Sequence, residues 1–188
     1  GMEPTAPQYS TRFDLRLGDC VAGMKSLPEE SIDLVVTSPP YNLGIGYEKY
    51  EDRLSPEDYL AWSREWTGEV RRLLKPGGSF FLNVGAAPSN PLFPHQVVLA
   101  LTEDLFVLQN TFHWIKSVTV ETRAGQQVTA GHFKPINSPR FVTDCHEFIF
   151  HFTPAGRTKL DRRAVGVPYQ DKSNAARWAI LRRRTRGR

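Results

Sequence analysis

Several features are scarce in this 188-residue sequence, and their scarcity excludes whole classes of protein. No apolar run approaches the roughly 18 residues that a membrane-spanning helix needs, and no basic cluster precedes an apolar run as in a secretion signal. Two cysteines, Cys20 and Cys145, are too few for a disulfide framework, so we expect a cytoplasmic location. No cluster of His, Cys and Asp has the spacing of metal ligands, so we expect no metal site.

Charge is unevenly distributed along the chain. Residues 157–188 hold 11 Lys or Arg and 2 acidic residues, whereas residues 1–156 have a net charge of −5. This asymmetry indicates a polyanionic partner for a basic tail, with a solubilising or partly disordered end as the alternative. Residues 1–11 are short of apolar side chains and are predicted to form a flexible leader.

The hydrophobic pattern predicts an alternation of strands and helices. The expected strands are 13–17, 32–36, 79–84, 106–115 and 147–152, and the expected helices are 21–27, 56–74 and 95–105. This order is typical of an α/β protein with a largely parallel sheet and helices on its faces. The polar segment 117–145 is predicted to be a long loop, and long loops inside compact domains are usually either functional or disordered.

The segment Thr37–Asn42 directly follows an apolar strand and contains two consecutive prolines. Ligands of α/β sheets bind beyond the carboxyl ends of the strands, and consecutive prolines fix the directions of the neighbouring carbonyls. The Ser38 hydroxyl and a carbonyl of this segment can accept the two protons of an exocyclic amino group. Tyr41 can stack on the ring that carries it. A turn that merely closes the strand is the alternative.

The sequence around this turn resembles the DNA amino-methyltransferases in their β arrangement, which transfer a methyl group from S-adenosylmethionine (SAM) to an exocyclic nitrogen. The segments that carry the resemblance, in chain order, are Leu17–Asp19, Leu27–Val36, the Ser-Pro-Pro-Tyr tetrapeptide Ser38–Tyr41, Leu73–Gly78, His113–Lys116, Lys134–Arg140 and Cys145–Phe152. The resemblance implies a Rossmann-like methyltransferase sheet with helices on both faces. It also implies double-stranded DNA as substrate and a cognate restriction endonuclease as a partner. Serine at the first tetrapeptide position favours cytosine N4 over adenine N6.

The same resemblance implies a division of the chain and a set of site residues. The expected parts are a catalytic region 12–116, a target-recognition region 117–145, a strand region 146–156 and the basic tail 157–188. The expected contacts are Ser38, Pro39, Pro40 and Tyr41 to a base flipped out of the duplex, Asp19 and Asn42 to SAM, and Lys116, Arg123, Lys134 and Arg140 to DNA.

Structural roles compete with several of these assignments. Asp19 could form a turn and Asn42 an Asx turn. The aromatic stripe Tyr59, Trp62 and Trp66 is better explained as helix core than as a stacking platform for bases. The chain has no Pro-Cys dipeptide, which argues against the cysteine-nucleophile route to carbon-5 methylation.

One motif of the family is absent from these 188 residues. In the β arrangement a glycine-rich cofactor motif, Asp-Pro-Phe-x-Gly-x-Gly, comes late in the chain, and Gly44-Ile45-Gly46 is not a substitute. A truncated or inactive methyltransferase that acts as a DNA-binding module is therefore an alternative. A methyltransferase for RNA or protein amides is another, although those enzymes use Asn-Pro-Pro-Tyr.

Overall fold

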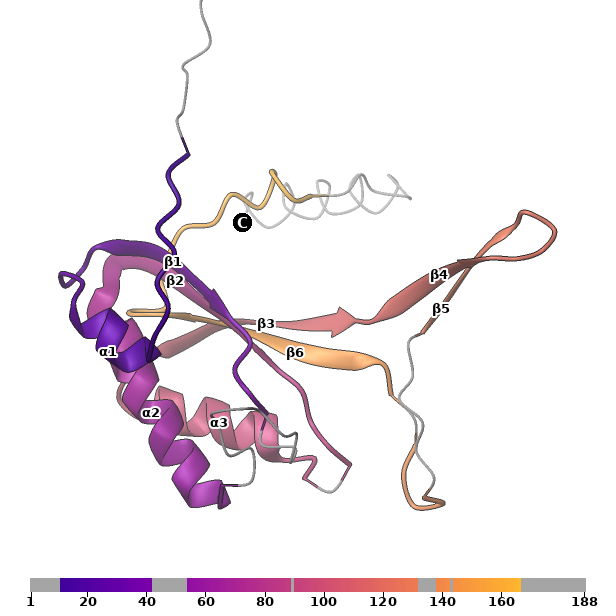
Figure 1. Cartoon of the computed structure of the whole chain (residues 1–188), viewed down its shortest axis with the longest axis horizontal. Helices are drawn as coiled ribbons and strands as arrows, with labels where there is room; N and C mark the ends of the chain where they lie inside the picture. The colour runs from indigo at the N-terminus through magenta and orange to yellow at the C-terminus, as the bar shows by residue number, and fades with distance from the viewer. Residues whose placement is uncertain (1–10, 42–53, 89, 132–137, 143, 167–188) are drawn as a thin grey trace, which may run out of the picture. The chain divides into compact units, whose positions relative to one another are not determined.

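The computed structural model describes residues 11–41, 54–88, 90–131, 138–142 and 144–166. Its elements are α1 (Cys20–Lys25), β1 (Ile32–Thr37), α2 (Pro56–Leu73), β2 (Leu74–Val84), α3 (Phe93–Thr102), β3 (Val107–Ile115), β4 (Ser117–Glu121), β5 (Gln127–Gly131) and β6 (His146–Thr153) (Figure 1). Contacts divide the chain into two units, the first ending at Thr158 and the second beginning at Lys159. In the second unit, Asp161 Oδ1 accepts hydrogen bonds from the backbone N–H groups of Arg163 and Ala164.

Four strands form one sheet in the order β1-β2-β6-β3. β1 and β2 are parallel, whereas β6 lies antiparallel to both β2 and β3. The expectation of a largely parallel sheet is therefore wrong, because the last strand is reversed and inserted between β2 and β3. A parallel return needs a crossover of a dozen or more residues, usually a helix. The described part of the segment between β3 and β6 contains the strands β4 and β5 and no helix. The chain therefore comes back beside β3 in the opposite direction, and β6 pairs with it antiparallel.

One face of this sheet packs against the helices and forms the core. Phe80 and Leu82 on β2 and Phe150 and Phe152 on β6 are at most 3% exposed on this face. Trp66 of α2 meets Phe80 edge-on, with ring centroids 5.9 Å apart. Figure 1 shows α1, α2 and α3 on the same side of the sheet. The α/β class is confirmed, and the helices expected on the second face are not among the described residues.

The predicted helix 56–74 is confirmed as α2, and local sequence explains where it begins. Ser55 Oγ accepts the Asp58 backbone N–H at 3.0 Å, and Pro56 occupies the first helical position. Tyr59 and Trp66 of the aromatic stripe are buried in the core, as expected.

Residues 13–17 do not form the strand that their alternation predicts. Phe13, Leu15 and Leu17 are 81%, 93% and 107% exposed, and no described strand pairs with them. A strand needs a hydrogen-bonding neighbour and a surface that buries its apolar side chains, and this segment has neither among the described residues.

The expected loop 117–145 contains a two-stranded ribbon, β4–β5, which continues from the end of β3 (Figure 1). Thr119 and Thr129 face each other across it, with their hydroxyl oxygens 3.0 Å apart. Gly125 closes its turn with φ +74°, a left-handed conformation that favours glycine. Val and Thr alternate on both sides of this glycine, which is the pattern of a β-hairpin. The loop prediction used only the polar composition of the segment and therefore did not include this hairpin.

Both cysteines are free. Among the described residues, no helix combines the length and apolarity needed to cross a membrane.

Candidate functional site

The proline turn, residues Thr37–Tyr41, leaves the sheet at the carboxyl end of β1, as the sequence predicts. On the helix-covered side, the Tyr59 hydroxyl donates a 2.5 Å hydrogen bond to the Pro40 carbonyl. Tyr59 lies on α2 and is 1% exposed, so a buried helix residue anchors the turn. The neighbouring Pro39 carbonyl accepts no hydrogen bond from any described residue, which leaves it available to a ligand.

Tyr41 anchors the other end of the proline turn to the second face of the sheet. Its hydroxyl donates to Asn83 Oδ1 of β2 at 2.9 Å and lies 3.4 Å from Glu147 Oε2 of β6. The Ser38 Oγ lies 2.6 Å from the same Tyr41 hydroxyl. Two side chains of the tetrapeptide are therefore joined directly, and Tyr41 ties them to β2 and β6, strands that are distant in sequence.

Gly85 provides the space that the Tyr41 ring occupies. A Cβ at residue 85 would lie 3.0 Å from Tyr41 Cε2 and 3.2 Å from Cδ2. A larger residue would therefore push the ring away from Asn83. The glycine directly after β2 is needed for close approach rather than for an unusual backbone conformation.

Glu147 is a nearly buried carboxylate whose charge is balanced by Lys116. Its side chain is 9% exposed, and Oε1 forms an ion pair with the Lys116 ammonium. Lys116 also lies over the Trp114 ring, 5.3 Å from its centroid. A buried carboxylate requires such a partner, so Lys116 is held at the second face. Its predicted contact with DNA stays a prediction.

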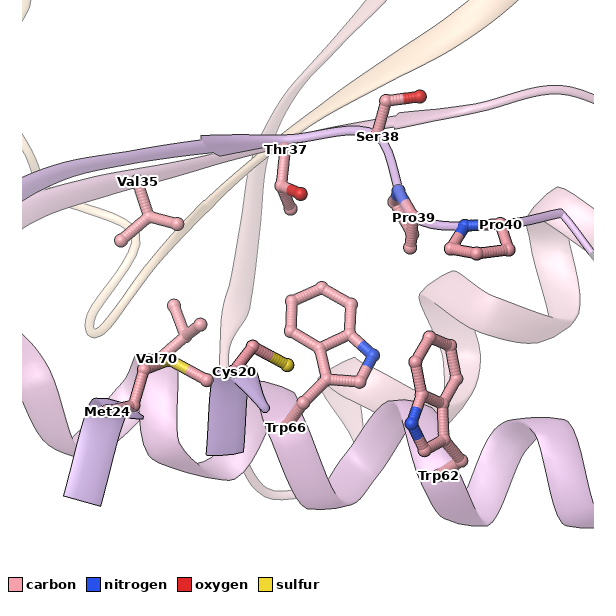
Figure 2. Close-up of a pocket in the computed structure, with 10 residues that line it drawn as sticks. All are labelled: Cys20, Met24, Val35, Thr37, Ser38, Pro39, Pro40, Trp62, Trp66 and Val70. Atoms are coloured by element: carbon pink, nitrogen blue, oxygen red, sulfur yellow. The ribbon is translucent and has the colours of Figure 1, made fainter. Parts of the chain in front are cut away.

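A cavity of about 350 Å³ lies on the other side of the proline turn, toward α1 and α2 (Figure 2). Its lining is mostly apolar and includes Cys20, Thr37, Pro39, Trp62 and Trp66. The buried indole N–H of Trp66 has no hydrogen-bond partner in the part of the chain that the structure describes. An unpaired buried donor is costly, and no described residue offsets that cost.

Asp19 caps helix α1, since its Oδ1 accepts the Ala22 backbone N–H at 2.9 Å. The residue is exposed, and its second carboxyl oxygen has no described partner. The turn-forming role and the cofactor contact are compatible, because each uses a different oxygen.

The remaining predicted site residues are dispersed. Arg123 lies in the turn of the β4–β5 ribbon, and Arg140 lies beside Phe141; both are exposed. Asn42 and Lys134 lie outside the described residues.

Sequence reasoning missed three residues that hold the proline turn in place, namely Tyr59, Asn83 and Glu147. Each lies in an apolar helix or strand pattern that is typical of core. The sequence does offer one signal for such residues, a polar side chain within an apolar pattern, because a buried polar group needs a hydrogen-bond partner. The identity of those partners depends on the tertiary fold.

Comparison with known proteins adds family information to this geometry. Residues 32–185 match the family described as DNA methylase, N6/N4 methyltransferases. The chain is 40% identical over 120 residues to the type II methyltransferase M.MjaVI of Methanocaldococcus jannaschii, which covers 62% of this chain and 59% of that protein. It is 26% identical over 174 residues to M.PvuII of Proteus hauseri, covering 88% and 48%.

Solved structures agree in fold. The PvuII DNA methyltransferase (cytosine-N4-specific) has a TM-score of 0.59 at 24% identity, over 79% of this chain and 51% of that one. A Thermus thermophilus protein described as a DNA modification methylase, complexed with S-adenosyl-L-methionine, has a TM-score of 0.51 at 26% identity, covering 78% and 56%. The chain thus spans about half to three fifths of the length of these relatives.

Proposed function

Because the chain belongs to the DNA methylase family, we propose that its proline turn binds the exocyclic amino group of a base in DNA for methylation. The observation that carries this proposal is the arrangement of the Ser38 hydroxyl beside a Pro39 carbonyl without a described partner. Two acceptors on a rigid turn match the two protons of an amino group. The Pro40 carbonyl is not a candidate, because Tyr59 occupies it.

The turn contributes positioning and electrostatics rather than covalent chemistry. When both amino protons are held by oxygen acceptors, the nitrogen lone pair is directed away from them. SAM supplies the methyl group when bound. The amino nitrogen is reached after the base leaves the stack, and Tyr41, fixed by Asn83, is the side chain proposed to flank the extruded ring. Serine in the tetrapeptide favours cytosine N4.

The described residues fit SAM in part. Asp19 presents an exposed carboxylate with one oxygen available for an amino or hydroxyl group of the cofactor. Asn42, the second residue expected there, lies outside the described residues. The glycine-rich motif of the family is not present in these 188 residues.

Exposed arginines support DNA as the substrate. Arg123 at the tip of the β4–β5 ribbon and Arg140 are both exposed and have no described acidic partner, so both are available to phosphates. We propose that the ribbon forms part of the target-recognition region, with residues 117–145 as its expected extent. A cognate restriction endonuclease remains an expected partner by family.

The proposal is tested by methyl transfer from labelled SAM to unmethylated plasmid DNA, followed by digestion to nucleosides. We expect N4-methylcytosine and a loss of about 100-fold or more in Ser38→Ala, as for removal of one preorganised transition-state contact. Ser31→Ala is the matched control, because Ser31 Oγ bonds Pro28 O away from the proline turn. Near-normal turnover in Ser38→Ala would overturn the assignment.

Two further results distinguish the alternatives. If the labelled methyl group appeared in RNA or protein instead of DNA, the alternative of an RNA or protein-amide methyltransferase would be favoured. Absence of both SAM binding and transfer would favour the alternative of a truncated or inactive methyltransferase that acts as a DNA-binding module.

A further inference from the structure

The hydrogen bonds around Ser38 have a definite direction, which can be read from what each atom is able to donate. The Asn83 Nδ2 lies 3.1 Å from the Phe148 carbonyl, which can only accept. The amide nitrogen must therefore face Phe148, and the amide oxygen must face Tyr41. Asn83 thus presents an acceptor, not a donor, to the Tyr41 hydroxyl 2.9 Å away.

This orientation determines what Tyr41 does. A phenol has one proton, and both neighbours on the second face, Asn83 Oδ1 and Glu147 Oε2, are acceptors. The Tyr41 proton is therefore directed to the second face. Since that proton is committed, the 2.6 Å bond between Ser38 and Tyr41 must use the proton of Ser38.

We propose that Asn83 is a positioning residue that sets Ser38 as an acceptor for the substrate amino group. With its proton donated to Tyr41, the Ser38 oxygen keeps both lone pairs for the ligand. Without the Asn83 acceptor, Tyr41 can donate to Ser38, and the serine proton is then free to oppose the amino protons. The hydroxyl relay, Ser38–Tyr41–Asn83, thus deepens the proposed function and rests on it.

Glu147 reinforces the direction of the relay from the same face. Its Oε2 is a second acceptor for Tyr41 at 3.4 Å, beyond normal hydrogen-bond length, and its Oε1 is paired with Lys116. Glu147 accepts at both oxygens, from Lys116 at Oε1 and from Tyr41 at Oε2. The distances assign the main role to Asn83 and a supporting role to Glu147.

The test compares Asn83→Leu with Asn110→Leu, which makes the same change on the same face. Asn110 is also partly buried, but its amide bonds His151 rather than the proline turn. For methyl transfer to plasmid DNA, we expect Asn83→Leu to lower kcat about 10-fold, as expected for one hydrogen bond, with the KM for DNA and the Kd for SAM unchanged. Asn110→Leu should leave kcat within about 2-fold.

A double variant separates the relay from a general loss of structure. Tyr41→Phe alone should also lower kcat about 10-fold, and in the Asn83→Leu background it should cause no further loss, because both changes break one relay. The inference would be overturned if the double variant lost kcat by the product of the two single losses. It would also be overturned if Asn83→Leu kept the wild-type kcat. If Ser38→Ala also turns over normally, the proposed function fails with it; if Ser38→Ala is inactive, only the relay fails.

A spectroscopic measurement does not depend on turnover. In protein labelled with ¹³C at the tyrosine ζ carbon, the Tyr41 signal is identified by its loss in Tyr41→Phe. It should shift in Asn83→Leu and stay in place in Asn110→Leu. An unchanged Tyr41 signal in Asn83→Leu would overturn the relay whatever the activity.

Discussion

The two faces of the four-stranded sheet carry different side chains, although the residues alternate along the same strands. On β2 and β6, Phe80, Leu82, Phe150 and Phe152 face the helices and are nearly inaccessible. Residues at the intervening positions of the same strands, Phe81, Asn83, Glu147 and His151, belong to the second face and include the polar groups that hold Tyr41. Alternation with a period of two thus lets one strand serve the core and the site together.

The second face is also apolar and accessible at its margins. Leu34 and Val36 on β1 are 55% and 70% exposed, and Trp114 on β3 is 49% exposed. On the helix-covered face, by contrast, the apolar side chains pack against the helices and form the buried core. Substitutions in sequence neighbours therefore provide matched tests of the difference between the faces.

The largest effect is expected from truncating the helix-covered face. Phe80→Ala should lower the free energy of unfolding by about 3–5 kcal/mol, because Phe80 is 0% exposed and contacts Trp66, Phe106 and Phe152. Phe81→Ala should cost on the order of 1–2 kcal/mol, since its ring is only half-buried and loses mainly the stack on His151. Urea unfolding of both variants measures the contrast, and equal losses would contradict it.

Tyr59→Phe removes the anchor of the proline turn on the helix-covered side. We expect a loss of about 1–3 kcal/mol in unfolding free energy, because the Pro40 carbonyl loses a partner in a partly buried position. Thermal unfolding measures this loss. A variant as stable as wild type would show that water replaces the tyrosine hydroxyl.

His151 makes the stability of the second face depend on pH. Burial lowers the pKa of His151 from its ordinary value near 6.5, and the ring lies between Asn110 and Ser79. The Asn110 amide donates to Nδ1, so the neutral ring donates from Nε2 to Ser79 Oγ. Below pH 6.5 the unfolded chain gains a proton that the folded ring resists.

The sign of this effect follows from linkage. The contribution of His151 is complete above about pH 6.5 and is lost as pH falls from there through the lowered folded-state pKa, at up to about 1.4 kcal/mol per pH unit. Urea unfolding at pH 7.5 and 5.5 should therefore show a smaller pH effect in His151→Gln than in wild type. An identical pH effect in both proteins would rule out His151 as the cause.

The smallest effect is expected at the exposed margin of the second face. Val36→Thr should change the unfolding free energy by less than about 0.5 kcal/mol, because Val36 is 70% exposed. Val35→Thr, one residue away, should cost about 1–2 kcal/mol, since Val35 packs against the core. A large loss in Val36→Thr would show that another part of the protein covers this margin.

Much of the fold could be predicted because its elements are marked locally. Ser55 and Pro56 mark the start of α2, and the apolar run of β1 ends at the prolines. Residues 13–17 have an equally good local pattern but form no strand, because pairing depends on a neighbour that local sequence does not contain. The reversed direction of β6 was also beyond reach, since an apolar run has no direction.

The position of the proline turn was predictable, but the way it is held was not. Ser38 and Tyr41 are noticeable from the tetrapeptide itself, and the structure joins them at 2.6 Å. Asn83 and Glu147 are 42 and 106 residues from Tyr41 in sequence. Nothing within the tetrapeptide indicates which residues will accept its hydroxyl proton.

The sequence by itself determined the α/β class, the rigid turn after β1 and the family resemblance, because proline geometry, helix capping and apolar periodicity act over a few residues. The tertiary structure decided the mixed sheet, the partly buried Glu147–Lys116 pair and the contacts from which the hydroxyl relay is proposed. Those features depend on strand order, which brings β1, β2 and β6 side by side. Hydrogen-bond direction exists only once the donor, the acceptor and their remaining partners are in place.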